Sequence, residues 1–381
     1  MRKFVSFFGL LAAFTVMQAI TSNATASELV IGQINAQTGN GASLGKPLAM
    51  GAQVYVDRVN AAGGIKNRKV RLITLDDQFK EKMTSELAEK LVADNGIVAL
   101  INTLGAPNID NLISSGFLNQ HRIPVIGPLT NSTTARDRNN PYVFFVRAGL
   151  REEVNAMVKQ VEILGFKKIG IFYQNDTSGL DGVNLITEAL AAKGLKPLVK
   201  ASYERQDFKA DQASKIFQEA KPEVILTISI AAATSQLVRN LGRSISSGVM
   251  IIANSGNSAD VLVKDLGADL ARGLAIVQVM PSVSNGALPI VKEFLQDFAK
   301  HAPAGAVANA MSLEGYLSAK ILFIAASRVK GELNRQSIYA AIGNMQLLDL
   351  GGYRVDFSNS KRLGSVYAEV AVLTGAGKLS R

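Results

Sequence analysis

One complete strand–loop–helix–turn–strand unit near the start of the chain constrains the fold more than any other feature. The apolar run Leu29–Ile34 gives way to a polar, glycine-rich loop, Asn35–Gly45, and apolar residues then recur at helical spacing from Leu44 to Val59. The pair Gly63-Gly64 ends that helix, because glycine tolerates positive φ, and the run Lys69–Leu75 resumes as a strand. The pattern predicts a βαβ unit whose loop opens at the carboxyl edge of a parallel sheet, where such sheets bind ligands.

The rest of the chain continues this alternation of strands and helices. A first series, including a helix over Pro107–Gln120, runs to the strand Ile123–Ile126, and a second begins near Arg151 and runs to Val249–Ile252. The polar stretch Pro128–Pro141 between the two series reads as a surface loop or a crossing between lobes. The chain of 381 residues is longer than one hydrophobic core usually covers. We therefore expect an α/β protein with two doubly wound parallel-sheet lobes.

The first 26 residues are expected to form a signal peptide. Met1-Arg2-Lys3, the apolar run Phe4–Ile20 and the small residues Ala24-Thr25-Ala26 have the order of a secretory signal and its cleavage site. The alternative, an uncleaved membrane anchor, is disfavoured because the run is short and interrupted by polar residues. The chain has no Cys, and hence neither a disulfide framework nor a thiol for a lipid anchor. We therefore expect a periplasmic protein that is not embedded in the membrane.

The opening unit resembles a known family. Its TG loop, the LG that follows, the GA-containing helix, the turn VNAAGGI and the strand start NRKV are similar to the branched-chain amino-acid-binding (leucine-binding) proteins, the periplasmic receptors of ABC importers. The resemblance implies a type I periplasmic binding fold in which the chain crosses between the lobes three times and forms a three-strand hinge. It also implies a receptor rather than an enzyme, with a small-molecule ligand and an ABC permease at the inner membrane as partners.

The same resemblance implies the lobe boundaries. The first lobe is expected to contain residues 27–147 and 279–363, and the second lobe residues 148–278 and 364–381.

The ligand positions of the family fall on short polar loops of this sequence. By resemblance, the ligand-binding residues are Gly105, Ala106, Thr130, Asn131, Ser132, Arg151, Ser178 and Ser255. In the family the first lobe holds the ligand carboxylate, whereas an acidic residue of the second lobe pairs with the ligand ammonium. At the corresponding positions, Ser178 and Ser255, this chain has no carboxylate, and a buried ammonium without a counter-charge is costly.

Arg151 replaces a small polar or acidic residue of the family and, if it points inward, attracts a second anionic group. These positions favour a small organic acid, such as an aromatic or a dicarboxylic acid, over a typical α-amino acid. A sensory receptor with the same binding fold remains an alternative, because the sequence does not separate transport from signalling.

A secreted serine hydrolase is a further alternative. Gly41-Ala42-Ser43-Leu44-Gly45 matches the G-x-S-x-G pattern, but the pattern requires the serine on a sharp turn at a strand end, with a His and an acid nearby. Ser43 lies eight residues after the end of its strand. His121 and His301 are the two histidines of the sequence, and hence the only His candidates for the catalytic base. The same loop spaces its glycines wrongly for a dinucleotide fingerprint. No catalytic residue is therefore assigned.

Charge and composition point to no cofactor, metal or nucleic acid. The formal net charge is +10, but the basic residues are dispersed, and the chain has no Trp to stack on bases. With no Cys and two separated His, a dedicated transition-metal site lacks ligands. A positive surface can still steer anionic ligands toward a cleft.

Overall fold

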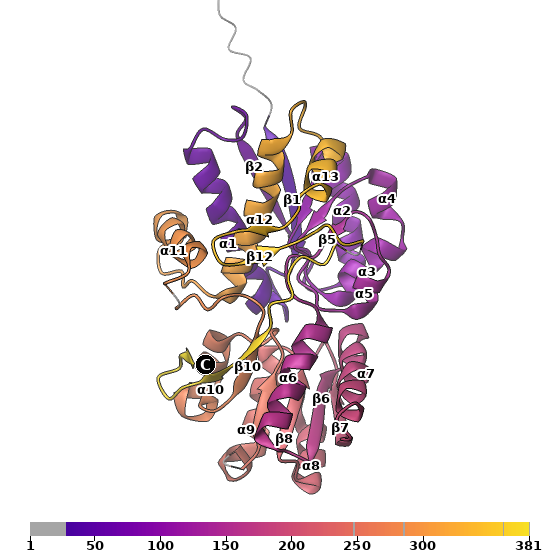
Figure 1. The fold of residues 1–381 in the computed structure, drawn as a ribbon, viewed down its shortest axis with the longest axis vertical. Coiled ribbons are helices and arrows are strands. Elements are labelled where there is room, and N and C mark those ends of the chain that lie inside the picture. The colour runs from indigo at the N-terminus through magenta and orange to yellow at the C-terminus, as the bar shows by residue number, and fades with distance from the viewer. Residues whose placement is uncertain (1–27, 247, 285, 361, 381) are drawn as a thin grey trace, which may run out of the picture.

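The computed structural model describes residues 28–246, 248–284, 286–360 and 362–380, so the expected signal peptide lies outside the described residues. The molecule is elongated and consists of two α/β lobes stacked along its long axis (Figure 1). Each lobe is built around its own sheet. The two-lobed α/β architecture expected from the sequence is confirmed.

The first lobe contains a five-stranded sheet in the order β2-β1-β3-β4-β5, and every neighbouring pair is parallel. Three helices from the last third of the chain return to this lobe, where α12 packs along α1 (Figure 1). The elements of the first lobe are β1 (Leu29–Asn35), α1 (Ala42–Ala61), β2 (Val70–Asp76), α2 (Glu81–Asn95), β3 (Leu100–Ile101), α3 (Ala106–Ser114), α4 (Phe117–His121), β4 (Val125–Ile126), α5 (Thr133–Asp137), β5 (Val143–Phe144), α11 (Pro289–His301), α12 (Ala310–Arg328), α13 (Arg335–Gly343), β11 (Leu348–Asp349) and β12 (Arg354–Val355).

The second lobe contains a seven-stranded sheet in the order β14-β13-β10-β9-β8-β6-β7. Five strands are parallel, but β13 and β14 at the edge are antiparallel, so this sheet is mixed rather than wholly parallel. The elements of the second lobe are α6 (Leu150–Leu164), β6 (Ile169–Gln174), α7 (Thr177–Ala191), β7 (Pro197–Tyr203), α8 (Asp211–Ala220), β8 (Val224–Ile228), α9 (Ala231–Ser246), β9 (Met250–Ala253), α10 (Ala259–Ala271), β10 (Ala275–Gln278), β13 (Glu369–Leu373) and β14 (Leu379–Ser380).

The chain passes between the two sheets three times: after β5, after β10 and after β12. These crossings are tied to one another. The buried Tyr353 hydroxyl shares its proton between the carbonyl oxygens of Val146 and Val279, at 3.1 and 3.3 Å, and Leu363 forms a parallel bridge with Phe145. Three connections that are joined in this way are typical of a hinge about which two lobes rotate.

The stretch 128–141 is only in its last part, from Asp137 on, the exposed loop that its composition predicts, and it is not a crossing between the lobes. It contains α5, and Thr130, Ser132 and Arg136 are buried. The Arg136 guanidinium donates to the carbonyl oxygens of Thr130, Arg147 and Ala148, and it lies 4.3 Å from the centre of the Phe145 ring. The Arg136 guanidinium can be buried here because these backbone carbonyl groups, two of them on the first crossing, accept its hydrogen bonds.

Other elements differ from the sequence-based prediction at glycine and polar positions. The single helix expected over Pro107–Gln120 is wrong, because Gly116 adopts a left-handed conformation (φ 78°) and separates α3 from α4. Strand β7 and helix α10 were not predicted. Strand β7 alternates exposed and buried residues at the sheet edge, and helix α10 is interrupted by a non-helical Gly267 (φ 76°), so neither has a strong apolar signature.

The contact between α1 and α12 is close enough to require glycine. A methyl carbon added at Gly315 meets the Leu48 carbonyl oxygen at 1.9 Å, and one added at Gly51 meets the Ser312 carbonyl oxygen at 1.8 Å. Both clashes are with backbone, which moves only if the helices separate.

We therefore predict that Gly315→Ala lowers the free energy of unfolding by about 3 kcal/mol, through overpacking of the first lobe. Urea denaturation of the variant measures this change. Gly331→Ala is the matched control, because a carbon added there meets nothing within 4 Å. Equal stability of the two variants would contradict the packing described.

Candidate functional site

A cavity lies between the two lobes, at the ends of their strands. In the first lobe, Phe79, Leu104 and Leu129 follow β2, β3 and β4, while in the second lobe Gln174 and Ile228 end β6 and β8. The lining residues are Leu44, Phe79, Leu104, Gly105, Ala106, Leu129, Thr130, Asn131, Arg147, Gln174, Asp176, Ser178, Gly179, Ile228, Ser229, Ile230, Asn254, Ser255 and Gly256. The carboxyl ends of both sheets thus face each other, as expected for ligand binding in open α/β sheets.

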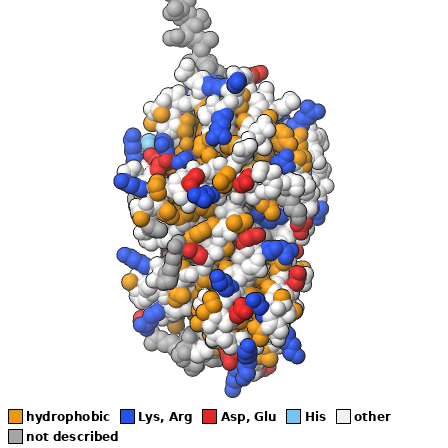
Figure 2. Space-filling model, viewed as in Figure 1, with side chains coloured by type: hydrophobic (Ala, Val, Ile, Leu, Met, Phe, Trp, Pro, Cys, Tyr) orange, Lys and Arg blue, Asp and Glu red, His pale blue; other side chains and the backbone are white. Residues whose placement is uncertain are grey.

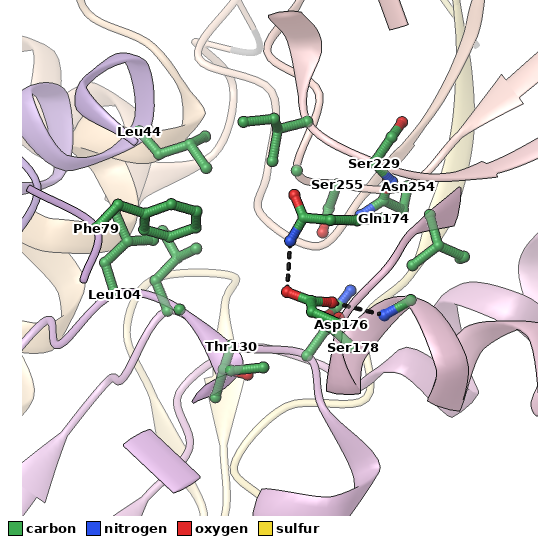
Figure 3. A pocket seen from close by; sticks show the side chains of 18 of the residues that line it. Leu44, Phe79, Leu104, Thr130, Gln174, Asp176, Ser178, Ser229, Asn254 and Ser255 are labelled. Atoms are coloured by element: carbon green, nitrogen blue, oxygen red, sulfur yellow. Dashed lines mark hydrogen bonds between the residues drawn. The ribbon is translucent and has the colours of Figure 1, made fainter. Parts of the chain in front are cut away.

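The two sides of this cavity differ in chemistry. Figure 3 shows the side chains of Leu44, Phe79 and Leu104 on one side and those of Gln174, Asp176 and other polar second-lobe residues on the other. The first three belong to one apolar cluster, together with Leu129 and Ile230 of the cavity lining. A bound solute would therefore meet a hydrocarbon surface on one side and hydrogen-bonding groups on the other.

Six of the eight residues expected to bind ligand line this cavity: Gly105, Ala106, Thr130, Asn131, Ser178 and Ser255. Ser132 and Arg151 do not. Ser132 caps α5, accepting from the Ala135 amide at 3.3 Å, and donates to Asp181 across the cleft at 3.1 Å. Arg151 is exposed in the first turn of α6, so the condition that it points inward is not met.

Two of the predicted residues, Ser178 and Asn131, bind each other across the cleft. The Ser178 hydroxyl donates to Asn131 Oδ1 at 2.8 Å, and Asn131 Nδ2 donates to Glu153 Oε1 at 3.2 Å. The Gly105 amide donates to the Leu129 carbonyl at 3.1 Å, so it is not available to a carboxylate. Ala106, the first helical residue of α3, is left as the backbone donor of that loop.

A buried arginine that the sequence analysis did not identify lies at the base of the cavity. Arg147 is 2% exposed, donates to the Ser255 hydroxyl, and lies 3.8 Å from Glu153 and 3.5 Å from Glu314. Burial raises the pKa of Glu314, whereas Arg147 lowers it. Arg147 is thus paired with two buried carboxylates. Because these balance its charge, it attracts an anionic ligand only weakly.

A carboxylate also reaches the cavity, from Asp176 at the start of α7. It accepts hydrogen bonds from Gln174 Nε2 at 2.5 Å and from the Gly179 amide at 3.0 Å, both drawn in Figure 3. Arg205 Nη1 lies 3.8 Å from Asp176 Oδ2. Burial lowers the pKa of Arg205, and Asp176 offsets that effect.

Ser178 and Ser255 suggested that the second-lobe surface of the cleft has no carboxylate. In the structure this surface does carry one, that of Asp176. A second carboxylate, that of Glu153, lies next to Ser255. The Ser255 amide donates to it at 2.7 Å and the Ser255 hydroxyl donates to it at 2.8 Å. The sequence contained a signal for one of the two missed residues. Arg147 directly follows the apolar run Val143–Val146, and a charge at the end of a buried strand requires a partner. Asp176 reads in sequence only as a helix cap.

The features of the hydrolase alternative do not meet in this structure. Ser43 lies in the first turn of α1, and neither His is among the residues that line the cavity. His121 pairs with Glu89 at 3.2 Å and packs against Phe117. Within the described ranges no three His, Asp or Glu side chains are grouped so as to hold a metal ion, and no helix is long and apolar enough to cross a bilayer.

Lys and Arg side chains show no nucleic-acid footprint on the face drawn in Figure 2. They are scattered there among acidic and apolar side chains rather than gathered in a stripe. This face is therefore one of mixed charge, although the sequence has a formal net charge of +10.

Asp110 gives the folded protein a pH dependence that can be measured. Burial in α3 raises its pKa to about 6, the nearby Arg138 opposes this, and Asp181 and Asp176 of the second lobe add to it. The folded state therefore binds this proton more tightly than the unfolded chain, and this contribution to stability is lost as the pH rises from about 4 to about 6.

We predict that Asp110→Asn removes this loss, so that the variant gains stability relative to wild type at pH 7 but not at pH 4. Urea unfolding at the two pH values measures the difference. Asp356→Asn is a control with the opposite sign, because hydrogen bonds from Ser358 lower the pKa of that exposed carboxyl. A stability difference between the Asp110 variant and wild type that does not change with pH would refute the assignment.

Comparison with known proteins agrees with this architecture. The periplasmic binding protein family matches residues 28–376. A Leu/Ile/Val-binding protein homologue of Brucella abortus is 24% identical over 356 residues, which cover 89% of this chain and 86% of the relative.

Solved structures agree as well. A substrate-binding periplasmic protein from Ralstonia solanacearum has 27% identity and a TM-score of 0.88, covering 92% of this chain and 99% of that one. An extracellular ligand-binding receptor from Verminephrobacter eiseniae has 27% identity and a TM-score of 0.87, covering 93% of this chain and all of that one. A branched-chain amino acid transporter substrate-binding protein from Streptococcus pneumoniae, solved with isoleucine, shares the fold at 17% identity, with a TM-score of 0.82 and coverage of 93% and 98%. The chain belongs to the periplasmic binding protein family, with the type I fold that its opening unit implied.

Proposed function

We propose that this protein is the periplasmic solute-binding receptor of an ABC importer, and that it captures a small organic carboxylate between its lobes without changing it chemically. The observation that carries the proposal is the cavity lined from both lobes at the carboxyl ends of their strands. The expected signal peptide of residues 1–26 and the expected permease partner belong to the same proposal. Its relative in Brucella abortus is named as a homologue of Leu/Ile/Val-binding proteins, which supports a solute of similar size.

The lining suggests how such a solute would be oriented. Its hydrocarbon part would pack against Phe79 and the leucines beside it, and its carboxylate would accept from the Ala106 amide and the Thr130 hydroxyl. A second acidic group, as in a dicarboxylate, gains no support, because Arg151 is exposed and Arg147 is already paired with two glutamates. A monocarboxylate is the simplest solute that fits.

Lobe closure completes this site. The bonds of Ser178 to Asn131, and of Ser132 and Thr134 to Asp181, join residues of opposite lobes and form only when the cleft is closed. We propose that residues 27–147 with 279–363 and residues 148–278 with 364–381 move as the two units. A solute that contacts both units binds the closed state more tightly and shifts the hinge equilibrium toward it.

We predict that small monocarboxylates such as 4-methylpentanoate and phenylacetate raise the melting temperature of the purified protein. Affinities near micromolar correspond to about 8 kcal/mol of binding free energy. A ligand that binds the folded state and not the unfolded state stabilises the folded state by mass action. Differential scanning fluorimetry against a panel of carboxylates, amino acids, sugars and amines measures this. Stabilisation by sugars or amines alone would end the proposal.

Two variants test the placement of the carboxylate. Thr130→Val removes one hydroxyl with little change in shape, and we expect about ten-fold weaker binding, as for the loss of one hydrogen bond to a charged group. Arg151→Ala is the matched control, because Arg151 lies outside the cavity and should leave the affinity unchanged. Isothermal titration calorimetry compares the two, and the reverse result would place the ligand elsewhere.

A further inference from the structure

We propose that Arg205 determines which solutes the cleft accepts: by neutralising Asp176, its neighbour in the second lobe, it selects carboxylates that lack an ammonium group. This inference rests on the proposed function and deepens it by naming the ligand class and the residue pair that sets it.

Arg205 belongs to the second lobe but reaches the first. It follows β7, and its Nη2 donates to the Phe79 carbonyl at 3.1 Å and to Asn108 Oδ1 at 2.8 Å. Its guanidinium carbon lies 3.7 Å from the centre of the Phe79 ring, and its side chain is only 11% exposed. A charge so enclosed, stacked and hydrogen-bonded has a fixed position in the closed state.

In that position Arg205 lies beside the carboxylate that a bound ligand would meet. Among the described residues that line the cavity, Asp176 carries the only carboxylate, and it is 9% exposed with Arg205 Nη1 at 3.8 Å. Its oxygens also accept from Gln174 and from the Gly179 amide. Asp176 is therefore neutralised by the protein itself, and a ligand ammonium brought to it would also approach the Arg205 guanidinium.

The two buried glutamates beside the cavity, Glu153 and Glu314, cannot take over the role of ammonium acceptor. Glu153 is fully buried, and its oxygens accept from Ser255 and Asn131, with Arg147 beside them. Glu314 is fully buried beside Arg147. Neither glutamate is among the residues that line the cavity. Whether Asp176 is free or paired with Arg205 then decides whether the cavity accepts an ammonium group, because a buried ammonium without a partner is strongly disfavoured.

A matched pair of ligands tests this inference. Leucine and 4-methyl-2-oxopentanoate have the same carbon skeleton and carboxylate and differ only in the ammonium or ketone at the second carbon. We expect wild-type protein to bind the oxo acid at least about ten-fold more tightly than leucine in isothermal titration calorimetry, as one unpaired charge costs this much or more.

Arg205→Met removes the charge but keeps an unbranched apolar side chain against Phe79. It leaves Asp176 as a free carboxylate in the cavity, so we expect tighter leucine binding and a selectivity ratio that falls by about ten-fold or more. Arg205→Gln serves as a second uncharged variant if the first does not fold. Arg205→Lys retains the charge and should keep the preference for the oxo acid.

Arg205 also holds the lobes together, and Asn40→Ala controls for that contribution. Asn40 Nδ2 donates across the cleft to the carbonyl of Gln206, the neighbour of Arg205, at 2.7 Å. Its loss should weaken both ligands by the same factor and leave their ratio unchanged. The double variant Arg205→Met with Asp176→Asn should lose the gain in leucine binding.

Three results would overturn the inference: leucine bound by wild type as tightly as the oxo acid, an equal loss of both ligands in both uncharged variants, or a gain in leucine binding that persists without Asp176. Each leaves the receptor function intact, provided that carboxylates still stabilise the wild-type protein. If no carboxylate does so, the proposed function fails as well, and the solute panel reveals this separately.

Discussion

The buried charge of Arg147 is the interaction on which the rest of this structure depends. It lies on the first crossing between the lobes, contacts Glu314 of the first lobe and Glu153 of the second, and donates to Ser255 at the cavity. Removing water from such a group costs several kcal/mol unless partners surround it. The position of the crossing, the packing of α12 and the second-lobe surface of the cleft are therefore linked through one side chain.

The polar groups of the cleft are largely satisfied by the protein in the closed state. Ser178 binds Asn131, Ser255 binds Glu153, and Arg205 lies beside Asp176. Opening exchanges the bond between Ser178 and Asn131 for water, whereas the other two pairs lie within the second lobe and stay together. A ligand has to compete with both kinds of bond. Specificity then depends on which protein bonds a solute can replace, because burying a polar group without a partner is costly.

Sequence reasoning identified the loops of the site better than its charges. Gly105, Ala106, Thr130 and Asn131 were predicted from the resemblance to the family, whose ligand positions fall on loops after parallel strands, and such loops converge at one edge of a sheet. Arg151 was predicted because the resemblance places it near the cleft, whereas the buried Arg147, four residues earlier, was missed. Asp176 was missed because its sequence context is that of an ordinary helix cap.

The sequence by itself determined the alternation of strands and helices, the two lobes and the family, because these follow from local apolar periodicity and short turn patterns. Only the tertiary structure decided which polar groups pair. The contacts of Arg205 with Asn108 and of Ser255 with Glu153 join residues about a hundred positions apart. Partners so distant are fixed by how two sheets face each other, and no local pattern records that.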